Sequence, residues 1–178
     1  MSDNEKQSFV ELIENFSLPK YNEIPNVGLY LEQTAKYISE YLETLKQPAL
    51  TGSMISNYVK KGLVSNPVKK QYNRKQIAYL IFIAIAKSVL SIDDIKLLIE
   101  IQKQTYPPET AYSYFEEELK NIINYVFGIN TSLREIGKYS TTEKTILRNL
   151  IITVAHKVYL DNCFSELKES TEKTETSV

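Results

Sequence analysis

Polar and basic side chains recur between residues 52 and 61 with a chemistry suited to a phosphate-bearing partner. Spacings of three and four residues place five of them on the outward side of one short helix: Ser53, Ser56, Asn57, Lys60 and Lys61. Lysine ammonium groups contact phosphates, whereas the amide of Asn57 can pair bidentately with the edge of an adenine. We therefore expect Ser53, Ser56 and Asn57 to reach base edges of duplex DNA, with Lys60 and Lys61 on its phosphate backbone.

Charge is segregated along the chain. No acidic residue occurs between Glu43 and Asp93, and eight of the 21 basic residues lie there, which leaves 13 basic against 22 acidic residues elsewhere. Such segregation is typical of a surface for an anionic partner, although basic residues are often only a solvated face. Four further basic residues extend the candidate surface: Lys69, Lys70, Arg74 and Lys75.

The remaining reactive side chains do not combine into a site. His156 is the only histidine and Cys163 the only cysteine. On one helix about 10 Å of rise separates them, which predicts neither a zinc site nor a Cys–His nucleophile pair. The consecutive acids at 116–118 diverge by about 100° each on a helix, which favours a solvated face. We expect no enzymatic activity, metal or cofactor.

Helix start and stop signals place the basic residues on defined elements. The hydroxyl of Thr51 suits the residue before a helix, and Gly62 suits the left-handed position after its end. The segment 63–72, with a turn at residues 65–67, predicts a small basic wing with two lysines on its return limb. Capping boxes predict two further helices, one starting at Asn73 with Gln76 and one at Ser91 with Asp94.

Apolar spacing predicts the rest of the fold. It indicates helices over residues 5–16 and 31–45, the second of which would form a helix-turn-helix with the helix after Thr51. Pro108 suits the first position of another helix, and a capping box of Ser140 and Glu143 begins a long final one. That final helix is apolar on more than one face, and we expect Ile151 on a contact between two copies of the chain.

The central residues resemble a known family. The pattern Ile55-x-x-Tyr58-x-x-x-Gly62-Leu63, then Lys70-x-Tyr72, then Ile77-x-x-Leu80-x-x-Ile83, then Leu90-Ser91-Ile92-Asp93-Asp94-Ile95-Lys96 resembles the winged-helix domain of MerR-type transcriptional regulators. The resemblance covers roughly residues 50–100. It departs from the family at Ser56, where those proteins usually carry arginine, at Asn57, where they carry an aromatic residue, and at Val89, where they carry glycine.

Two shorter segments carry a closer resemblance. Residues 54–60 and 24–31 are similar to a family of Gram-positive bacterial proteins that contain a domain of unknown function. That resemblance implies no activity.

Together these observations predict a mainly α protein: a winged helix-turn-helix with a short β wing, plus a C-terminal helical region. We expect a DNA-binding domain with N-terminal helices over 1–104, a helical dimerisation region over 105–168 and a disordered tail over 169–178. The longest apolar run, 77–86, is too short to span a bilayer, which would take about 20 residues, so we expect a cytoplasmic protein without membrane contact.

The predicted function is sequence-specific transcriptional regulation through duplex DNA bound by a homodimer. The alternative is a protein-interaction module whose winged helix no longer binds DNA and whose basic face meets an acidic partner. The 13 tyrosines, including Tyr106, Tyr112, Tyr114 and Tyr125, are interpreted as core and interface residues. The other interpretation is that they line a pocket for a small-molecule effector.

Overall fold

The computed structural model describes residues 13–137 and 141–175, with side chains as far as Lys168. The fold is mainly helical, with a small two-stranded antiparallel sheet. The elements, in chain order, are η1 (Tyr21–Glu23), β1 (Leu29–Tyr30), α2 (Leu31–Thr44), α3 (Gly52–Lys60), β2 (Gln71–Tyr72), α4 (Arg74–Ala86), α5 (Ile92–Thr105), α6 (Pro108–Val126) and α7 (Thr142–Glu175).

The helices begin where their capping residues predict. The side chain of Asn73 accepts from the amide of Gln76 at 3.1 Å, and the side chain of Gln76 accepts from the amide of Asn73 at 2.9 Å. Ser91 Oγ accepts from the amide of Asp94 at 3.2 Å, and Pro108 is the first residue of α6. These bonds satisfy amides that a helix otherwise leaves without partners. Ser140 lies outside the described residues, and Thr141 Oγ1 accepts from the amide of Lys144 instead.

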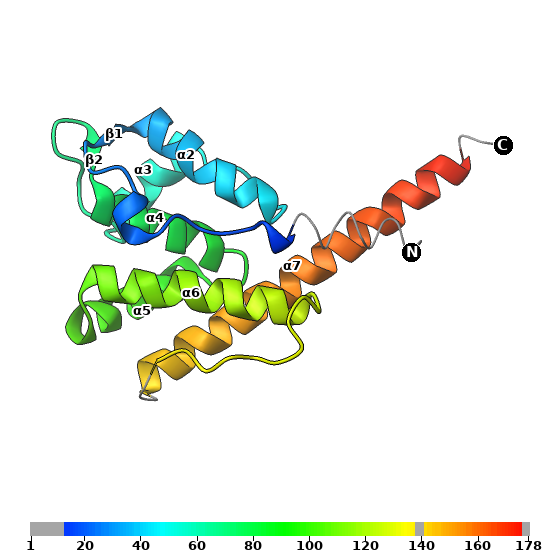
Figure 1. Ribbon diagram of the computed structural model, residues 1–178. Coiled ribbons are helices and arrows are strands. Elements are labelled where there is room, and N and C mark those ends of the chain that lie inside the picture. Colours follow the sequence, from blue (N-terminus) through cyan, green and yellow to red (C-terminus); the bar gives the residue numbers. More distant parts are fainter. Residues whose placement is uncertain (1–12, 138–140, 176–178) are drawn as a thin grey trace.

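The hydrophobic core is organised around α4. Most of this helix is buried on every side, as its apolar run predicts, and Ile77, Leu80, Ile81 and Ile83 have no exposed surface. It lies between α2 and α6 and also contacts α7 (Figure 1). One continuous core runs from Ile13 to Val158 and so includes both regions predicted from the sequence.

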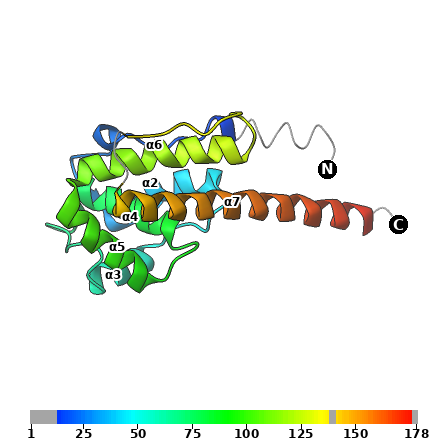
Figure 2. The same ribbon diagram turned by 90° about the horizontal axis from the view of Figure 1, so that it is seen from below.

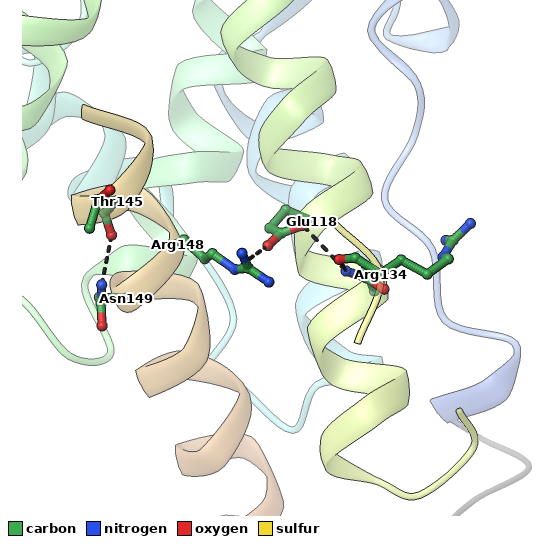
Figure 3. A network of polar contacts seen from close by, with 6 residues as sticks. Glu118, Arg134, Thr145, Arg148 and Asn149 are labelled. Carbon is green, nitrogen blue, oxygen red and sulfur yellow. Dashed lines mark hydrogen bonds and ion pairs between the residues drawn. The ribbon is translucent and has the colours of Figure 1, made fainter. Parts of the chain in front are cut away.

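The C-terminal region is built from α6 and the first half of α7, which pack along one another. Glu118 on α6 forms an ion pair with Arg148 on α7, with Oε1 and Nε 2.9 Å apart. Asn121 Nδ2 donates to Glu118 Oε2 at 3.3 Å and to the carbonyl oxygen of Arg134 at 2.9 Å, so the connecting segment joins the same network (Figure 3). Two helices and a loop are therefore held together by polar contacts as well as by apolar burial.

One expectation for α7 needs correction. Ile151, expected at a contact between two copies, is 0% exposed within a single chain, because the body of the protein already covers that face. The backbone of α7 is helical to Glu175, and the disordered tail expected over 169–178 stays a prediction. The last turns of its backbone point away from the body of the molecule (Figures 1 and 2).

The N-terminal segment before η1 contributes to the core. The expected helix over 5–16 lies mainly outside the described residues, although Ile13 and Phe16 are buried in the core.

Among the described helices, none combines the length and the apolarity needed to cross a bilayer. In that same part of the chain, no three side chains of His, Cys, Asp or Glu gather in a way that would hold a metal ion.

Candidate nucleic-acid interface

The outward face of α3 and its C-cap residue carry all five predicted residues. Ser53, Ser56, Asn57, Lys60 and Lys61 are exposed, while Ile55 and Tyr58 on the opposite face are buried in the core. Thr51 caps the helix by accepting from the amide of Met54 at 3.3 Å. Gly62, with φ of 77°, follows the helix in the left-handed conformation that glycine adopts without strain. The spacing of this segment thus predicts its exposed and buried faces correctly.

A close contact fixes α3 on α2. A side chain at position 52 would place its Cβ 2.4 Å from Glu32 Oε1 and 3.2 Å from Leu31, so glycine allows the two helices to meet. Ser39 Oγ on α2 accepts from the amide of Leu50 at 3.0 Å and donates to the carbonyl oxygen of Ala35 at 2.8 Å. The carboxylate of Glu32 therefore lies over the first turn of α3, where it complements the helix dipole and disfavours a phosphate.

The polar side chains of α3 differ in whether their hydrogen-bonding groups are free to bind a ligand. Ser56 Oγ donates to the carbonyl oxygen of Gly52 at 2.9 Å, and the hydroxyls of Ser53 and Thr51 are 2.9 Å apart. Within the part of the chain that the structure describes, Asn57, Lys60 and Lys61 form neither hydrogen bonds nor ion pairs through their side chains. The second half of α3 thus offers an amide and two ammonium groups to a ligand.

The two lysines of the wing segment form a tight turn. The amide of Val68 donates to the carbonyl oxygen of Gln71 at 3.1 Å, and the amide of Gln71 donates back to the carbonyl oxygen of Val68 at 2.9 Å. Between them Lys69 and Lys70 have φ of 50° and 64°, the left-handed pair of a type I′ turn. The sequence indicated the turn at residues 65–67, three residues too early. It gave no signal at 69–70, because such turns normally contain Asn-Gly.

The conformation of this turn is costly for lysine. A side chain with a Cβ carries a penalty of roughly 1–2 kcal/mol in the left-handed region, and here two neighbouring residues incur it. Both lysines are exposed, and Val68 beside them is 68% exposed. The turn therefore presents two cations and one apolar side chain to solvent at the end of the molecule opposite the projecting half of α7 (Figures 1 and 2).

The turn is supported by the rest of the domain. Strand β2, directly after it, pairs antiparallel with β1, with Leu29 opposite Tyr72 and Tyr30 opposite Gln71. The side-chain amide of Gln76 on α4 donates to the carbonyl oxygens of Ser65 and Asn66 at 2.9 and 3.1 Å. The sequence gives Gln76 only a capping role, so this anchoring role was missed.

Arg74 has a structural contact in place of the expected exposed position. Its Nε donates to the carbonyl oxygen of Ile24 at 2.8 Å and its Nη2 to that of Asn22 at 2.9 Å, and the guanidinium lies 5.8 Å from the ring centre of Tyr21. The guanidinium thus holds the N-terminal arm, the segment at residues 19–28 before β1, against α4. Lys75 is exposed, but it borders a cavity between α4 and α6. The candidate interface is accordingly narrowed to α3 and the turn at 68–71.

Comparison with known proteins gives a family and no activity. The family described as "Domain of unknown function (DUF1836)" matches residues 19–115, which extend from the N-terminal arm into α6. No curated protein and no solved structure matches the chain.

Proposed function

We propose that the chain, which belongs to the DUF1836 family, is a transcriptional regulator that binds duplex DNA through α3 and the turn at 68–71. In this proposal α2 and α3 form the helix-turn-helix of a MerR-like winged helix, α3 enters the major groove, and the turn contacts the neighbouring backbone. One observation carries the proposal: a strained two-lysine turn and an exposed Asn-Lys-Lys face occur in the same acid-free segment.

The lysines supply affinity and Asn57 supplies discrimination. Lys60 and Lys61 at the end of α3 and Lys69 and Lys70 on the turn would contact phosphates. Asn57 is the best placed residue for a base edge, because its amide is exposed and unoccupied in the described structure while the serine hydroxyls already have partners. A single α3 reads few base pairs, so we propose a homodimer on two half-sites.

The rival function is that of an interaction module whose basic surface binds an acidic protein. Glu32 over the first turn of α3 counts against DNA in the groove, because that carboxylate would repel its phosphates. The serine hydroxyls that are bonded within α3 also reduce the number of groups available to read bases. Purification separates the two functions: nucleic acid that salt removes supports DNA binding, and a stoichiometric acidic protein supports the rival.

The direct experiment is a salt titration of the full chain on a random-sequence duplex, followed by fluorescence anisotropy. The variant replaces Lys60, Lys61, Lys69 and Lys70 with alanine. Each lost phosphate contact lowers the slope of log K against log salt by about one unit, so the variant should lose about four units and most of its affinity.

The matched control also removes four exposed lysines, but from other surfaces: Lys20, Lys36, Lys103 and Lys168. It has the same net charge as the test variant and should keep nearly all of the slope. If the two quadruple variants lose affinity equally, binding follows net charge and the assigned interface is wrong. Affinity and slope that stay at the wild-type values in the test variant contradict DNA binding by this surface.

A further inference from the structure

A cavity of about 100 Å³ lies beside α4, on the side away from α2. Its walls come from α4, α5, α6 and the start of α7, and it is partly open to solvent. None of its lining residues belongs to α3 or to the turn at 68–71, so it is separate from the candidate nucleic-acid interface.

The walls are apolar and largely aromatic. Tyr79, Phe82, Tyr112 and Phe115 line the interior, and the rings of Phe82 and Phe115 meet edge to face with centres 5.2 Å apart. Two hydroxyls of this wall are already bonded inside the protein: Tyr79 to Gln102 Oε1 at 2.9 Å, and Tyr112 to the carbonyl oxygen of Pro19 at 3.0 Å. The interior therefore suits the body of an apolar ligand rather than a polar one.

The volume of the cavity limits the apolar part of a ligand to a single ring. An apolar cavity of about 150 Å³ is known to hold one benzene molecule. The volume here is somewhat smaller and open on one side, so a monocyclic ligand would keep one edge at the mouth. A substituent on that edge would meet the charged side chains around the opening.

Two of the three charged side chains that line the cavity are cationic. These are Lys75 and Lys144, with Lys144 Nζ 5.0 Å from the ring centre of Tyr114. Lys103 Nζ lies 5.5 Å from the ring centre of Tyr79. Glu143 is the acidic side chain of the lining. These three lysines form no ion pair with any residue that the structure describes, so their charge is available to a ligand.

From this combination we infer that the cavity binds a small monocyclic aromatic carboxylate. The ring would pack against the aromatic walls, and the carboxylate would lie between Lys75 and Lys144 at the opening. The same α4 whose Tyr79 and Phe82 form the wall also carries Gln76, which holds residues 65 and 66 before the turn. We infer the binding site alone, and it does not depend on the proposed function.

The test is a titration of the full-length protein, without DNA, with benzoate followed by saturation-transfer NMR and calorimetry. Three probes separate the two contributions: benzyl alcohol keeps the ring without the charge, benzylamine reverses the charge, and acetate keeps the charge without the ring. Benzoate should bind saturably and at least tenfold more tightly than each of the three. Equal affinity for benzoate and acetate, or a preference for benzylamine, would overturn the inference.

Two variants locate the site. Ala111→Phe fills the cavity from a half-buried position of its lining and should abolish benzoate binding. The double variant Lys75→Ala with Lys144→Ala should bind benzoate no more tightly than benzyl alcohol. Lys36→Ala with Lys120→Ala, on surfaces outside the lining, is its control and should keep the wild-type preference. Should Ala111→Phe fail to fold, the double lysine variant decides, and wild-type benzoate affinity in it overturns the site.

Discussion

The ion pair between Glu118 and Arg148 is asymmetric, because the glutamate side chain is fully buried whereas 31% of the arginine side chain is exposed. Desolvation raises the pKa of Glu118 above its usual range, and the hydrogen bond from Asn121 and the charge of Arg148 only partly oppose it. The two members of the pair are therefore not equivalent for stability. Arg148 can turn to water when its partner is lost, but Glu118 cannot.

The first prediction follows from that asymmetry. Arg148→Met leaves a buried carboxylate without its cation and should lower the unfolding free energy at pH 7 by about 3 kcal/mol, at the low end for broken buried pairs. Glu118→Gln should cost about 1 kcal/mol. Urea denaturation of both variants measures the difference, and equal losses contradict the asymmetry.

The dependence on pH has a definite sign. Because the folded pKa of Glu118 is raised, the folded protein binds its proton more readily than the unfolded chain, so this residue's contribution to stability falls as pH rises through that pKa. Removing Arg148 raises the pKa further. The loss of unfolding free energy in Arg148→Met should thus be full at pH 7. It should shrink as pH falls towards 4.5, the ordinary pKa of the carboxyl. Lys157→Met, which breaks the exposed pair with Asp161 on the same helix, should cost under about 1 kcal/mol at either pH.

The second prediction concerns the strained turn. Lys69→Asn with Lys70→Gly supplies the residues that a type I′ turn prefers, and should raise the unfolding free energy by about 1 kcal/mol. The same change removes two proposed phosphate contacts and should lower the salt slope of DNA binding by about two units. Stability and affinity would then move in opposite directions, as expected where strain is kept for function.

Lys46→Gly provides the control for that variant. Lys46 also has a left-handed backbone, with φ of 51°, and it follows α2 at the far end of that helix from β1. Its replacement removes one charge at the same backbone conformation and should leave DNA binding within about twofold. A turn variant that gains stability but keeps its full affinity would show that the turn does not contact DNA.

The local features of the fold could be predicted from sequence because their causes are local. The cap at Thr51, the box of Asn73 with Gln76 and the left-handed Gly62 each depend on neighbours within four residues. The buried character of α4 follows from one apolar run. All of these agree with the structure.

Long-range contacts explain what sequence reasoning missed. The basic side chain of Arg74 predicts a place at the interface, but its partners are carbonyl oxygens 50 and 52 residues earlier in the chain. Backbone carbonyls carry no sequence signature, so no pattern could reveal them. Ile151 shows the same limit: an apolar side chain predicts that a helix face is covered, but it does not predict which part of the protein, or which second copy, covers it.

The third prediction is for discrimination between DNA sequences. Asn57→Ala should lose about 1–3 kcal/mol of preference at one base pair while its binding to random duplex stays nearly unchanged. Selection of bound sites from random duplexes, with wild type and variant in parallel, measures this. Ser53→Ala is the control, since its hydroxyl already pairs with Thr51, and it should select the wild-type site. An identical site for wild type and Asn57→Ala removes this residue from base recognition.

The last prediction concerns the proposed homodimer. In its second half α7 carries Leu160, Phe164 and Leu167 at spacings of four and three residues, and these side chains are 51%, 57% and 57% exposed. At about 100° per residue they lie on the opposite side of α7 from Ile151, so this exposed stripe replaces the face suggested by sequence as the candidate contact. Phe164→Glu would place a charge in that contact and should give monomers that bind half-sites at least tenfold more weakly, whereas Ser165→Glu, off the stripe, should remain dimeric. Light scattering at micromolar concentration measures both states. Ile151→Glu, by contrast, should unfold the protomer and not merely separate two copies. A wild-type protein that is monomeric in the light-scattering measurement contradicts the homodimer.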